Sequence, residues 1–513
     1  MSAEHLEGAA TRSGTQRGAE SFGAGARTLG RTGLSVTPMG FGGYRVTDDS
    51  PVHRRALADA LRGGVNLIDT STNYGGGGSE RLVGRIVANL VQQGEVRREQ
   101  LVIVSKVGYA QGENLERIKA RPDPYPEMVQ YSDALWHCIH PDFIRDQLAE
   151  SLDRTTLSRL DVVLLHNPEY FLLDAAKRGV PLDEARATLD ERCKAAFVVL
   201  EAAVAAGQIG WYGVSSNGFV EPADSPSFTS VSRMVELARE VAGDDHHFGV
   251  LQLPMNLLEL GAAHEPSGPQ GETPLQIAER ADLGVLVNRP LNAMMGAAGA
   301  RTQLRLAARP QASEAHASVD ATLAEVRKLE AQWATGLGKR LVTEAGEEAG
   351  DLFRWGRELS ARAESISSTQ QWAKLRYEVI APHLGETSAA LLSALTGEAR
   401  SAFAEWWEAY GTAMHGVFEA LEGRLRVSHR AQTDEITQRL DPLLPAPWRT
   451  MPLPAKAVLS LLGAPIGSVL VGMRQPGYVA EMLVLRDTPV RVLSAAAGVV
   501  DLRAVSAALA GLE

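Results

Sequence analysis

Cysteine is scarce in this chain, with only Cys138 and Cys193 among 513 residues. Two thiols are too few for the disulfide network that stabilises small secreted domains. The sequence also has no run of about 18 apolar residues, the length that a membrane-spanning helix needs. Residues 1–26 lack the apolar segment of a secretory signal, and their Gly, Ala, Ser and charged residues predict a disordered tail. We therefore expect a cytoplasmic protein that makes no membrane contact.

Positive charge is in deficit as well. There are 51 Lys and Arg residues against 62 Asp and Glu, which gives a formal net charge of −11. Nucleic-acid-binding surfaces are normally basic, so we expect no nucleic-acid partner. His137, Cys138 and His140 have metal-binding side chains, but they are adjacent and no second cluster accompanies them. We therefore predict no metal site.

A dinucleotide-binding glycine fingerprint is also missing. No Gly-x-Gly-x-x-Gly opens a strand–helix unit, so a Rossmann domain is not indicated. Residues 75–78 are four consecutive glycines, but the Lys-Ser or Lys-Thr pair of a phosphate-binding loop does not follow them. These glycines instead predict a flexible turn.

Short apolar, β-branched runs alternate with helix-like segments through most of the chain. Helical periodicity is clear in segments such as 51–62, 80–91 and 141–152. This alternation is typical of a parallel sheet with crossover helices, and eight strand candidates favour closure into an α/β (β/α)8 TIM barrel. The candidates are residues 38–43, 65–69, 101–106, 162–166, 210–215, 249–253, 283–288 and 468–471.

The spacing of the strands breaks once, between the seventh and the eighth. Residues 297–447 are rich in Ala, Leu, Glu and Arg, contain no convincing strand, and predict helices at 318–333, 347–366 and 388–430. Aromatic side chains as large as tryptophan can supply a core, so we predict an inserted all-α domain at 297–447. Its tryptophans, five of the chain's eight, are Trp333, Trp355, Trp372, Trp406 and Trp407.

The domain order that follows is a tail at 1–26, a first barrel part at 27–296, the helical insertion at 297–447, and a C-terminal barrel part at 448–513. The insertion joins strands seven and eight, and loops after barrel strands open on the face where active sites of this fold lie. We expect the insertion to influence substrate access and to be the surface for any protein partner.

Four ionisable residues lie at or just beyond the ends of predicted strands. Asp69, Lys106 and His166 each end an apolar run, and Tyr74 follows Asp69 by five residues. Because the carboxyl ends of barrel strands meet at one mouth, we expect these side chains to come together. A phenol, an amine, a carboxyl and an imidazole can together move a proton to or from a carbonyl oxygen. Each residue alone is more simply a cap, a packing residue or a rim charge, and only the ordered set indicates catalysis.

The neighbours of these residues resemble the aldo-keto reductase family. The likeness covers roughly residues 28–295 and 448–490, and four motifs in the right order make it specific. The family normally lacks the insertion. The matching segments are 29–36, similar to an N-terminal hairpin; 39–43, a first strand; 68–75 with Ser79 and Glu80; Ser105 with Lys106; 165–168; and 468–476, an eighth strand with a nucleotide-binding loop.

The resemblance implies a role for each member of the set. Tyr74 is the general acid, Lys106 lowers the pKa of its phenol, Asp69 holds the amine, and His166 donates a hydrogen bond to the substrate oxygen. Some relatives with a different reaction carry Glu at the position of His166. Histidine therefore favours carbonyl–alcohol chemistry over double-bond reduction.

The resemblance also implies NADP(H) or NAD(H), bound in extended form across the barrel mouth. Two departures leave the choice between the two cofactors open: Asn288 or Arg289 stands where relatives often have an aromatic residue, and Gly472-Met473 replaces a Lys-Ser pair. The implied contacts are Ser215, Ser216 and Gln252 for the carboxamide, Gly43 and Tyr44 for the nicotinamide and ribose, Gly472, Met473 and Arg474 for phosphate, and Glu481 for adenine.

The function expected from these observations is NAD(P)H-dependent interconversion of an aldehyde, ketone or sugar-like carbonyl and its alcohol. Two alternatives stay open at this point. Lys106 on a barrel strand could form a Schiff base, as in aldolases. The barrel could also be a non-enzymatic redox sensor or docking protein that acts through its insertion.

Overall fold

The computed structural model describes residues 5–22, 25–295, 302–306, 318–341, 349–486 and 500–511. The chain divides into two compact units. One is Met294–Arg439, and the other is built from the chain on either side of it. We describe each unit by itself.

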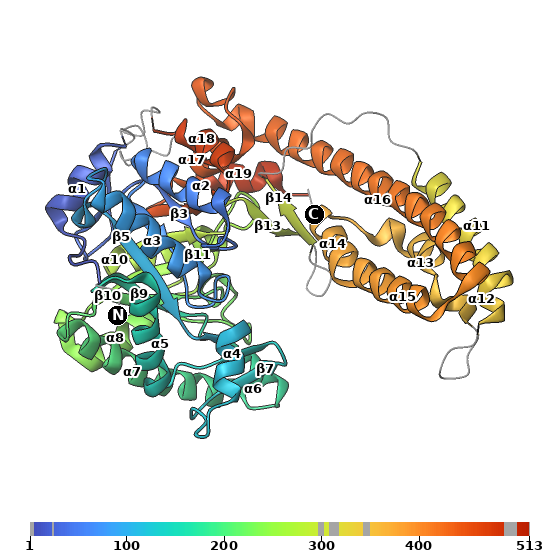
Figure 1. Cartoon of the computed structure of the whole chain (residues 1–513). Helices are drawn as coiled ribbons and strands as arrows, with labels where there is room; N and C mark the ends of the chain where they lie inside the picture. The colour runs from blue at the N-terminus through green and yellow to red at the C-terminus, as the bar shows by residue number, and fades with distance from the viewer. Residues whose placement is uncertain are drawn as a thin grey trace. The chain divides into compact units, whose positions relative to one another are not determined.

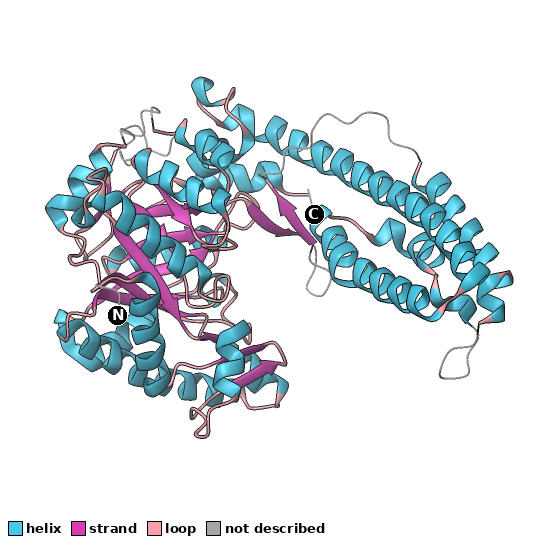
Figure 2. Ribbon diagram, viewed as in Figure 1, coloured by secondary structure: helices cyan, strands magenta, loops and turns pink. Residues whose placement is uncertain are grey.

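The larger unit contains a closed barrel of eight parallel strands (Figures 1 and 2). Each of the eight predicted strands is confirmed, with ends that differ from the prediction by two residues at most. Around the barrel the order is β3 (Met39–Gly42), β4 (Leu67–Asp69), β5 (Val102–Val107), β9 (Leu160–His166), β10 (Ile209–Ser215), β11 (Phe248–Pro254), β12 (Gly284–Asn288) and β15 (Ser468–Val471).

The barrel interior is filled by alternate strand residues. Val102 and Val104 of β5 share one buried cluster with Val162 and Leu164 of β9. Burying each such side chain contributes about 1.5–3 kcal/mol, which explains why these strands read as apolar runs. The outer faces of the strands are covered by helices (Figure 2), and α2 begins where Ser50 accepts a hydrogen bond from the His53 amide.

The helices of this unit have the following bounds. They are α2 (Pro51–Arg62), α3 (Gly78–Gln92), α4 (Gly112–Lys119), α5 (Pro141–Thr155), α6 (Tyr170–Lys177), α7 (Leu182–Ala205), α8 (Val231–Ala242), α9 (Gly261–His264), α10 (Pro274–Arg280), α17 (Leu453–Leu461), α18 (Pro476–Leu483) and α19 (Leu502–Leu509).

The N-terminal hairpin is confirmed, but the disordered tail is wrong for residues 5–22. Strands β1 (Arg27–Thr28) and β2 (Ser35–Val36) pair antiparallel. Helix α1 (Arg12–Glu20) precedes them, with buried Thr15 and Ala19. The physical reason is side-chain capping: Thr11 accepts from the Gly14 amide, and the Ala10 amide donates to Asp161 at 2.7 Å. Residues 1–4 and 23–24 of the predicted tail lie outside the described residues.

A small antiparallel sheet that the sequence did not predict follows β5. Its strands are β6 (Tyr109–Ala110), β7 (Val129–Ser132) and β8 (Leu135–His137), in the order β6-β8-β7. Strands of two to four residues give too little periodicity to be recognised in a sequence. This sheet brings Tyr109 and His137 close to the end of β9.

The second unit is largely helical, and tryptophan supplies much of its core as predicted. Trp333, Trp355 and Trp372 are buried in one cluster, with Trp406 and Trp407 packed against it. The indole of Trp406 donates to the Leu329 carbonyl at 3.0 Å. The helices are α11 (Val319–Thr335), α12 (Leu337–Arg340), α13 (Trp355–Arg362), α14 (Thr369–Lys374), a π-helical turn (Leu375–Ile380), α15 (Ala381–Ala394) and α16 (Gly397–Leu440).

Two details of this unit differ from the prediction. The expected helix at 388–430 is two helices, because Leu395 is extended and Gly397 has a φ of 56°, which glycine tolerates at no steric cost. A strand was not expected, yet β13 (Asn292–Met295) and β14 (Thr302–Arg305) form a two-stranded sheet. Parts of the predicted insertion, at 297–301, 307–317 and 342–348, lie outside the described residues. Over the described part of the chain, no helix combines the length and apolarity needed to cross a membrane.

Candidate active site

The four predicted catalytic residues meet at one end of the barrel. Asp69 is the last residue of β4, His166 is the last of β9, and Lys106 lies one residue before the end of β5. Tyr74 lies in the turn after β4, where its amide donates to the Ser71 carbonyl at 3.2 Å. Gly75, Gly76 and Gly77 continue this turn with positive φ angles, as the glycine run predicted.

Lys106 is the centre of the group. Its side chain is 0% exposed, and Nζ lies 2.7 Å from the Asp69 carboxylate and 2.9 Å from the Thr70 carbonyl. Nζ is also 3.3 Å from the Tyr74 hydroxyl. One buried ammonium therefore joins the carboxyl group and the phenol.

The pKa of the Tyr74 phenol is raised well above its usual value, by burial first and then by the charge of Asp69. The net shift is upward, so burial outweighs the lowering of this pKa that Lys106 was predicted to cause. The physical reason is that Asp69 neutralises Lys106 at 2.7 Å, so burial dominates at the phenol. Burial likewise raises the pKa of Asp69 and lowers that of Lys106. Tyr74 is consequently protonated at neutral pH and is available as a proton donor.

His166 lies beside Tyr74, where aromatic rings pack against its imidazole and His137 binds its backbone carbonyl. Its ring lies 6.0 Å from the Tyr74 ring and 4.6 Å from the Tyr109 ring, centroid to centroid. His137 Nε2 donates to the His166 carbonyl at 2.7 Å. Burial, with the charge of Lys106, lowers the His166 pKa well below its usual value, so the imidazole is neutral.

The imidazole nitrogens of His166 have different surroundings. Nδ1 lies 3.1 Å from the buried Ser71 hydroxyl, whereas Nε2 has no hydrogen-bond partner among the residues that the structure describes. Nε2 is therefore the nitrogen left for a substrate.

Gln252 connects this group to the predicted cofactor residues. Its Nε2 donates to Asp69 at 2.7 Å, and its Oε1 accepts from Ser215 at 3.1 Å and from Asn288 at 3.3 Å. Asn288 Oδ1 is buried and has no hydrogen-bond partner among the residues that the structure describes. A buried amide oxygen without a donor suits a ligand that brings an N–H group.

Ser216 is engaged differently. Its hydroxyl donates to Glu169 at 2.8 Å and accepts from the Gly218 amide at 3.0 Å. Glu169 is buried, also accepts from the Asn217 amide at 2.9 Å, and has its pKa raised to about 7 by burial. The Ser216 hydroxyl thus belongs to a polar cluster with Glu169, while the Ser216 amide donates to the Gln252 carbonyl at 3.0 Å. The sequence did not single out Glu169, because nothing in its spacing distinguishes it from a surface Glu.

Three further predicted cofactor contacts lie in the loops after the first and seventh barrel strands, and their surroundings differ. A Cβ at Gly43 would come within 2.5 Å of the Asp69 carbonyl, so a glycine is needed here for close packing. Tyr44 is 59% exposed, with its ring 5.3 Å from that of Tyr74. Arg289 pairs with Glu259 at 3.5 Å.

The loop after β15 contains the predicted phosphate contacts. Gly472 has open space where a side chain would be, and Arg474 has no ion-pair partner within the described ranges. Met473 is fully buried, so it packs in the core and offers no polar contact. Glu481 lies on α18, which starts directly after this loop. The Met473 side chain is apolar, and the phosphate contacts expected of Gly472, Met473 and Arg474 stay predictions.

Several aromatic side chains near His166 were missed in the sequence. Tyr109 accepts a hydrogen bond from Asn167 at 2.7 Å, and its ring lies 5.3 Å from that of Tyr170. Tyr170 in turn is 4.8 Å from Tyr131 of β7. These contacts depend on the β6–β8 sheet and on α6, so only the fold reveals them.

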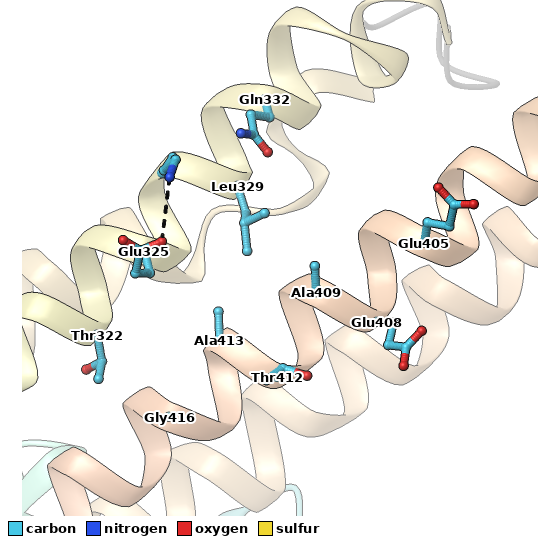
Figure 3. Close-up of a pocket in the computed structure, with 11 residues that line it drawn as sticks. Thr322, Glu325, Leu329, Gln332, Glu405, Glu408, Ala409, Thr412, Ala413 and Gly416 are labelled. Carbon is cyan, nitrogen blue, oxygen red and sulfur yellow. Dashed lines mark ion pairs between the residues drawn. The ribbon is translucent and has the colours of Figure 1, made fainter. Parts of the chain in front are cut away.

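The helical unit has a groove, but its lining differs from the catalytic group at the barrel mouth. A groove of about 680 Å³ lies between α11 and α16 of the helical unit (Figure 3). Its polar lining includes Glu325, Lys328, Glu405 and Glu408, without a Tyr or His. Across the described residues, no three His, Cys, Asp or Glu side chains are grouped to bind a metal ion.

Comparison with known proteins finds a family that part of this chain resembles. The sequence profile of the aldo/keto reductase family matches residues 38–242. The match covers less than half of the chain, and it shows that residues 38–242 are similar to the aldo/keto reductase family. The matched segment contains Asp69, Tyr74, Lys106 and His166.

Two curated relatives illustrate the likeness. L-galactose dehydrogenase of Arabidopsis thaliana is 29% identical over 155 residues, which are 29% of this chain and 40% of that protein. NADH-specific methylglyoxal reductase of Escherichia coli K12 is 27% identical over 177 residues, or 32% of this chain and 46% of that protein. This chain therefore spans less than half the length of either relative.

Among solved structures, an aldo/keto reductase from Klebsiella pneumoniae in complex with NADP and acetate aligns with a TM-score of 0.31 and 21% identity. The alignment covers 52% of this chain and 68% of that one.

Proposed function

We propose that this chain catalyses the NAD(P)H-dependent interconversion of an aldehyde, ketone or sugar-like carbonyl and its alcohol. The observation that carries the proposal is the 3.3 Å contact between Lys106 Nζ and the Tyr74 hydroxyl, beside a neutral His166 at the barrel mouth.

Tyr74 is the proton donor in this proposal. Reduction of a carbonyl leaves negative charge on its oxygen, and a proton must reach that oxygen. The raised pKa of Tyr74 keeps its proton in place until that charge develops. An alkoxide oxygen is more basic than a phenolate, so the transfer from Tyr74 to the developing alkoxide is downhill.

Lys106 stabilises the phenolate that remains. Its ammonium is already 3.3 Å from the phenol oxygen and is held by Asp69 and the Thr70 carbonyl. A charge fixed in a buried site stabilises developing negative charge without reorganisation. Asp69 is a positioning residue, because it holds Lys106 and is itself held by Gln252.

A nicotinamide dinucleotide supplies the hydride when it is bound. The unpartnered Asn288 Oδ1 fits the carboxamide N–H, and Gly472 with Arg474 fits a phosphate. Ser215 is linked to Asn288 by Gln252, whose Oε1 accepts a hydrogen bond from both side chains. These residues would hold the cofactor, whereas Met473 would contribute only packing.

The names of the relatives support carbonyl–alcohol chemistry. One is a dehydrogenase of the sugar L-galactose, and the other is a reductase of methylglyoxal. The contacts of Lys106 disfavour the Schiff-base alternative, because its Nζ is fully buried and already has three partners.

The test is turnover of the full chain with a panel of aldehydes, ketones and sugars, followed by NADPH and NADH absorbance. We expect cofactor oxidation that requires a carbonyl substrate. Borohydride should trap no adduct on Lys106. Trapping at Lys106 without cofactor turnover would replace this proposal with the aldolase-type reaction.

A further inference from the structure

A chain of side-chain hydrogen bonds leads away from His166 and has no part in the reaction described above. It runs from His166 Nδ1 to the Ser71 hydroxyl at 3.1 Å, and from that hydroxyl to Asn73 Oδ1 at 2.7 Å. Asn73 Nδ2 then donates to Gln111 Oε1 at 2.8 Å. Ser71 is fully buried, while Asn73 and Gln111 are partly exposed.

The order of donors in this chain fixes the position of one proton. A serine hydroxyl has a single proton to donate. Its shortest contact is Asn73 Oδ1, since the Lys106 carbonyl is 3.5 Å away. Asn73 Nδ2 is used by Gln111, so Oδ1 is the atom that faces Ser71. Ser71 must then accept from His166, which requires a proton on Nδ1.

A neutral imidazole has only one N–H, so a proton on Nδ1 leaves Nε2 as an acceptor. Nε2 is the nitrogen left for a substrate, because Nδ1 contacts Ser71. An acceptor there suits the O–H of an alcohol, whereas a carbonyl oxygen needs a donor. Reversing both amides of the chain would let Ser71 donate to Nδ1 and put the proton on Nε2.

We propose that Ser71, Asn73 and Gln111 are positioning residues that set the tautomer of His166, with Nδ1 protonated in the free enzyme. Reversal of the chain converts Nε2 from an alcohol acceptor to a carbonyl donor. The importance of this relay for turnover rests on the proposed function, but the tautomer itself does not.

The orientation of the ring supports a relay of this kind. The His166 ring cannot turn freely, because Tyr109 packs against it at 4.6 Å and Tyr74 lies at 6.0 Å. The strand behind it is fixed by pairing of His166 with Ser215 and by a 2.6 Å hydrogen bond from the Asn167 amide to the Ser215 carbonyl. Because the ring orientation is fixed, the hydrogen bonds from Ser71 to Gln111 can change only which nitrogen of His166 carries the proton.

The test is nitrogen NMR of the full chain with ¹⁵N-labelled histidine, using spectra that distinguish Nδ1–H from Nε2–H. A His166→Gln sample assigns the signal among the 12 histidines. We expect Nδ1–H in the wild type and in Asn73→Asp, because a carboxylate can only accept from Ser71. We expect Nε2–H in Asn73→Ala, because Ser71 is then free to donate to Nδ1.

Ser71→Ala should lose the Nδ1–H preference, and Ser151→Ala is its matched control. Ser151 lies on α5, and its buried hydroxyl has no hydrogen-bond partner in the described part of the chain. Its variant should give the wild-type spectrum. Nε2–H in the wild type, or the same tautomer in Asn73→Ala and Asn73→Asp, would overturn the proposal. Absence of carbonyl turnover in the wild type would instead refute the proposed function and leave the spectra valid.

Discussion

Replacing Lys106 with Met tests the electrostatic part of the site, because the side chain keeps its length but loses its charge. The ammonium lies 3.3 Å from the Tyr74 hydroxyl. At an effective dielectric constant of ~20, a phenolate at that distance gains about 5 kcal/mol from the charge. Asp69 cancels part of this gain, so the expected loss in kcat lies between about 10²-fold and 10⁴-fold.

The same substitution leaves Asp69 buried without its ion pair. Breaking such a pair costs about 3–5 kcal/mol of stability. The double variant Lys106→Met with Asp69→Asn removes the unpaired charge, so it should recover most of the melting temperature. It should not recover activity, since no charge then faces Tyr74.

Two assays on three proteins decide this prediction. Melting temperature and carbonyl reduction are measured for the wild type, the single variant and the double variant, each with saturating cofactor. Recovery of activity in the double variant would show that Lys106 serves only to balance Asp69. Wild-type turnover in the single variant would refute the role of its charge.

Three further predictions concern other parts of the chain. Burial raises the pKa of Glu169 from 4.5 to about 7, so ionising this carboxyl costs the folded state about 3 kcal/mol. The melting temperature of the wild type should therefore fall, relative to that of Glu169→Gln, as the pH rises from 4.5 to 7. Melting temperatures of the two proteins that change in parallel with pH would refute this. Arg474→Ala should weaken NADPH binding about 10–100-fold in a fluorescence titration, with a smaller loss for NADH if this side chain meets a 2′-phosphate. Unchanged affinity for both would exclude Arg474. Replacing residues 297–447 with a Gly/Ser linker should leave a folded barrel that binds cofactor, because all eight barrel strands lie outside that segment; loss of the cooperative melt would contradict it.

The barrel was predictable because its strands are buried on both faces. A parallel strand such as β9 or β11 therefore reads as a continuous apolar run, and its polar end residue stands out. Asp69, Lys106 and His166 were found in this way. The second unit's core was likewise visible in its tryptophans.

The features that were missed depend on contacts between distant segments. Helix α1 needs Asp161, which lies 151 residues from its partner Ala10. Tyr109 reaches His166 only through the small β6–β8 sheet. The direction of the Tyr74 pKa depends on burial and on the pairing of Lys106 with Asp69, neither of which a sequence pattern measures.

Tyr74→Phe is the most direct test of the proposed reaction, because it removes the proton donor and keeps the ring. The variant should bind NADPH or NADH with wild-type affinity, since the phenol hydroxyl contacts Lys106 and no predicted cofactor residue. Its rate of carbonyl reduction should fall by at least about 10²-fold, the lower end of general acid–base effects. Reduction at the wild-type rate, with cofactor bound, would contradict the assignment of Tyr74 as the acid.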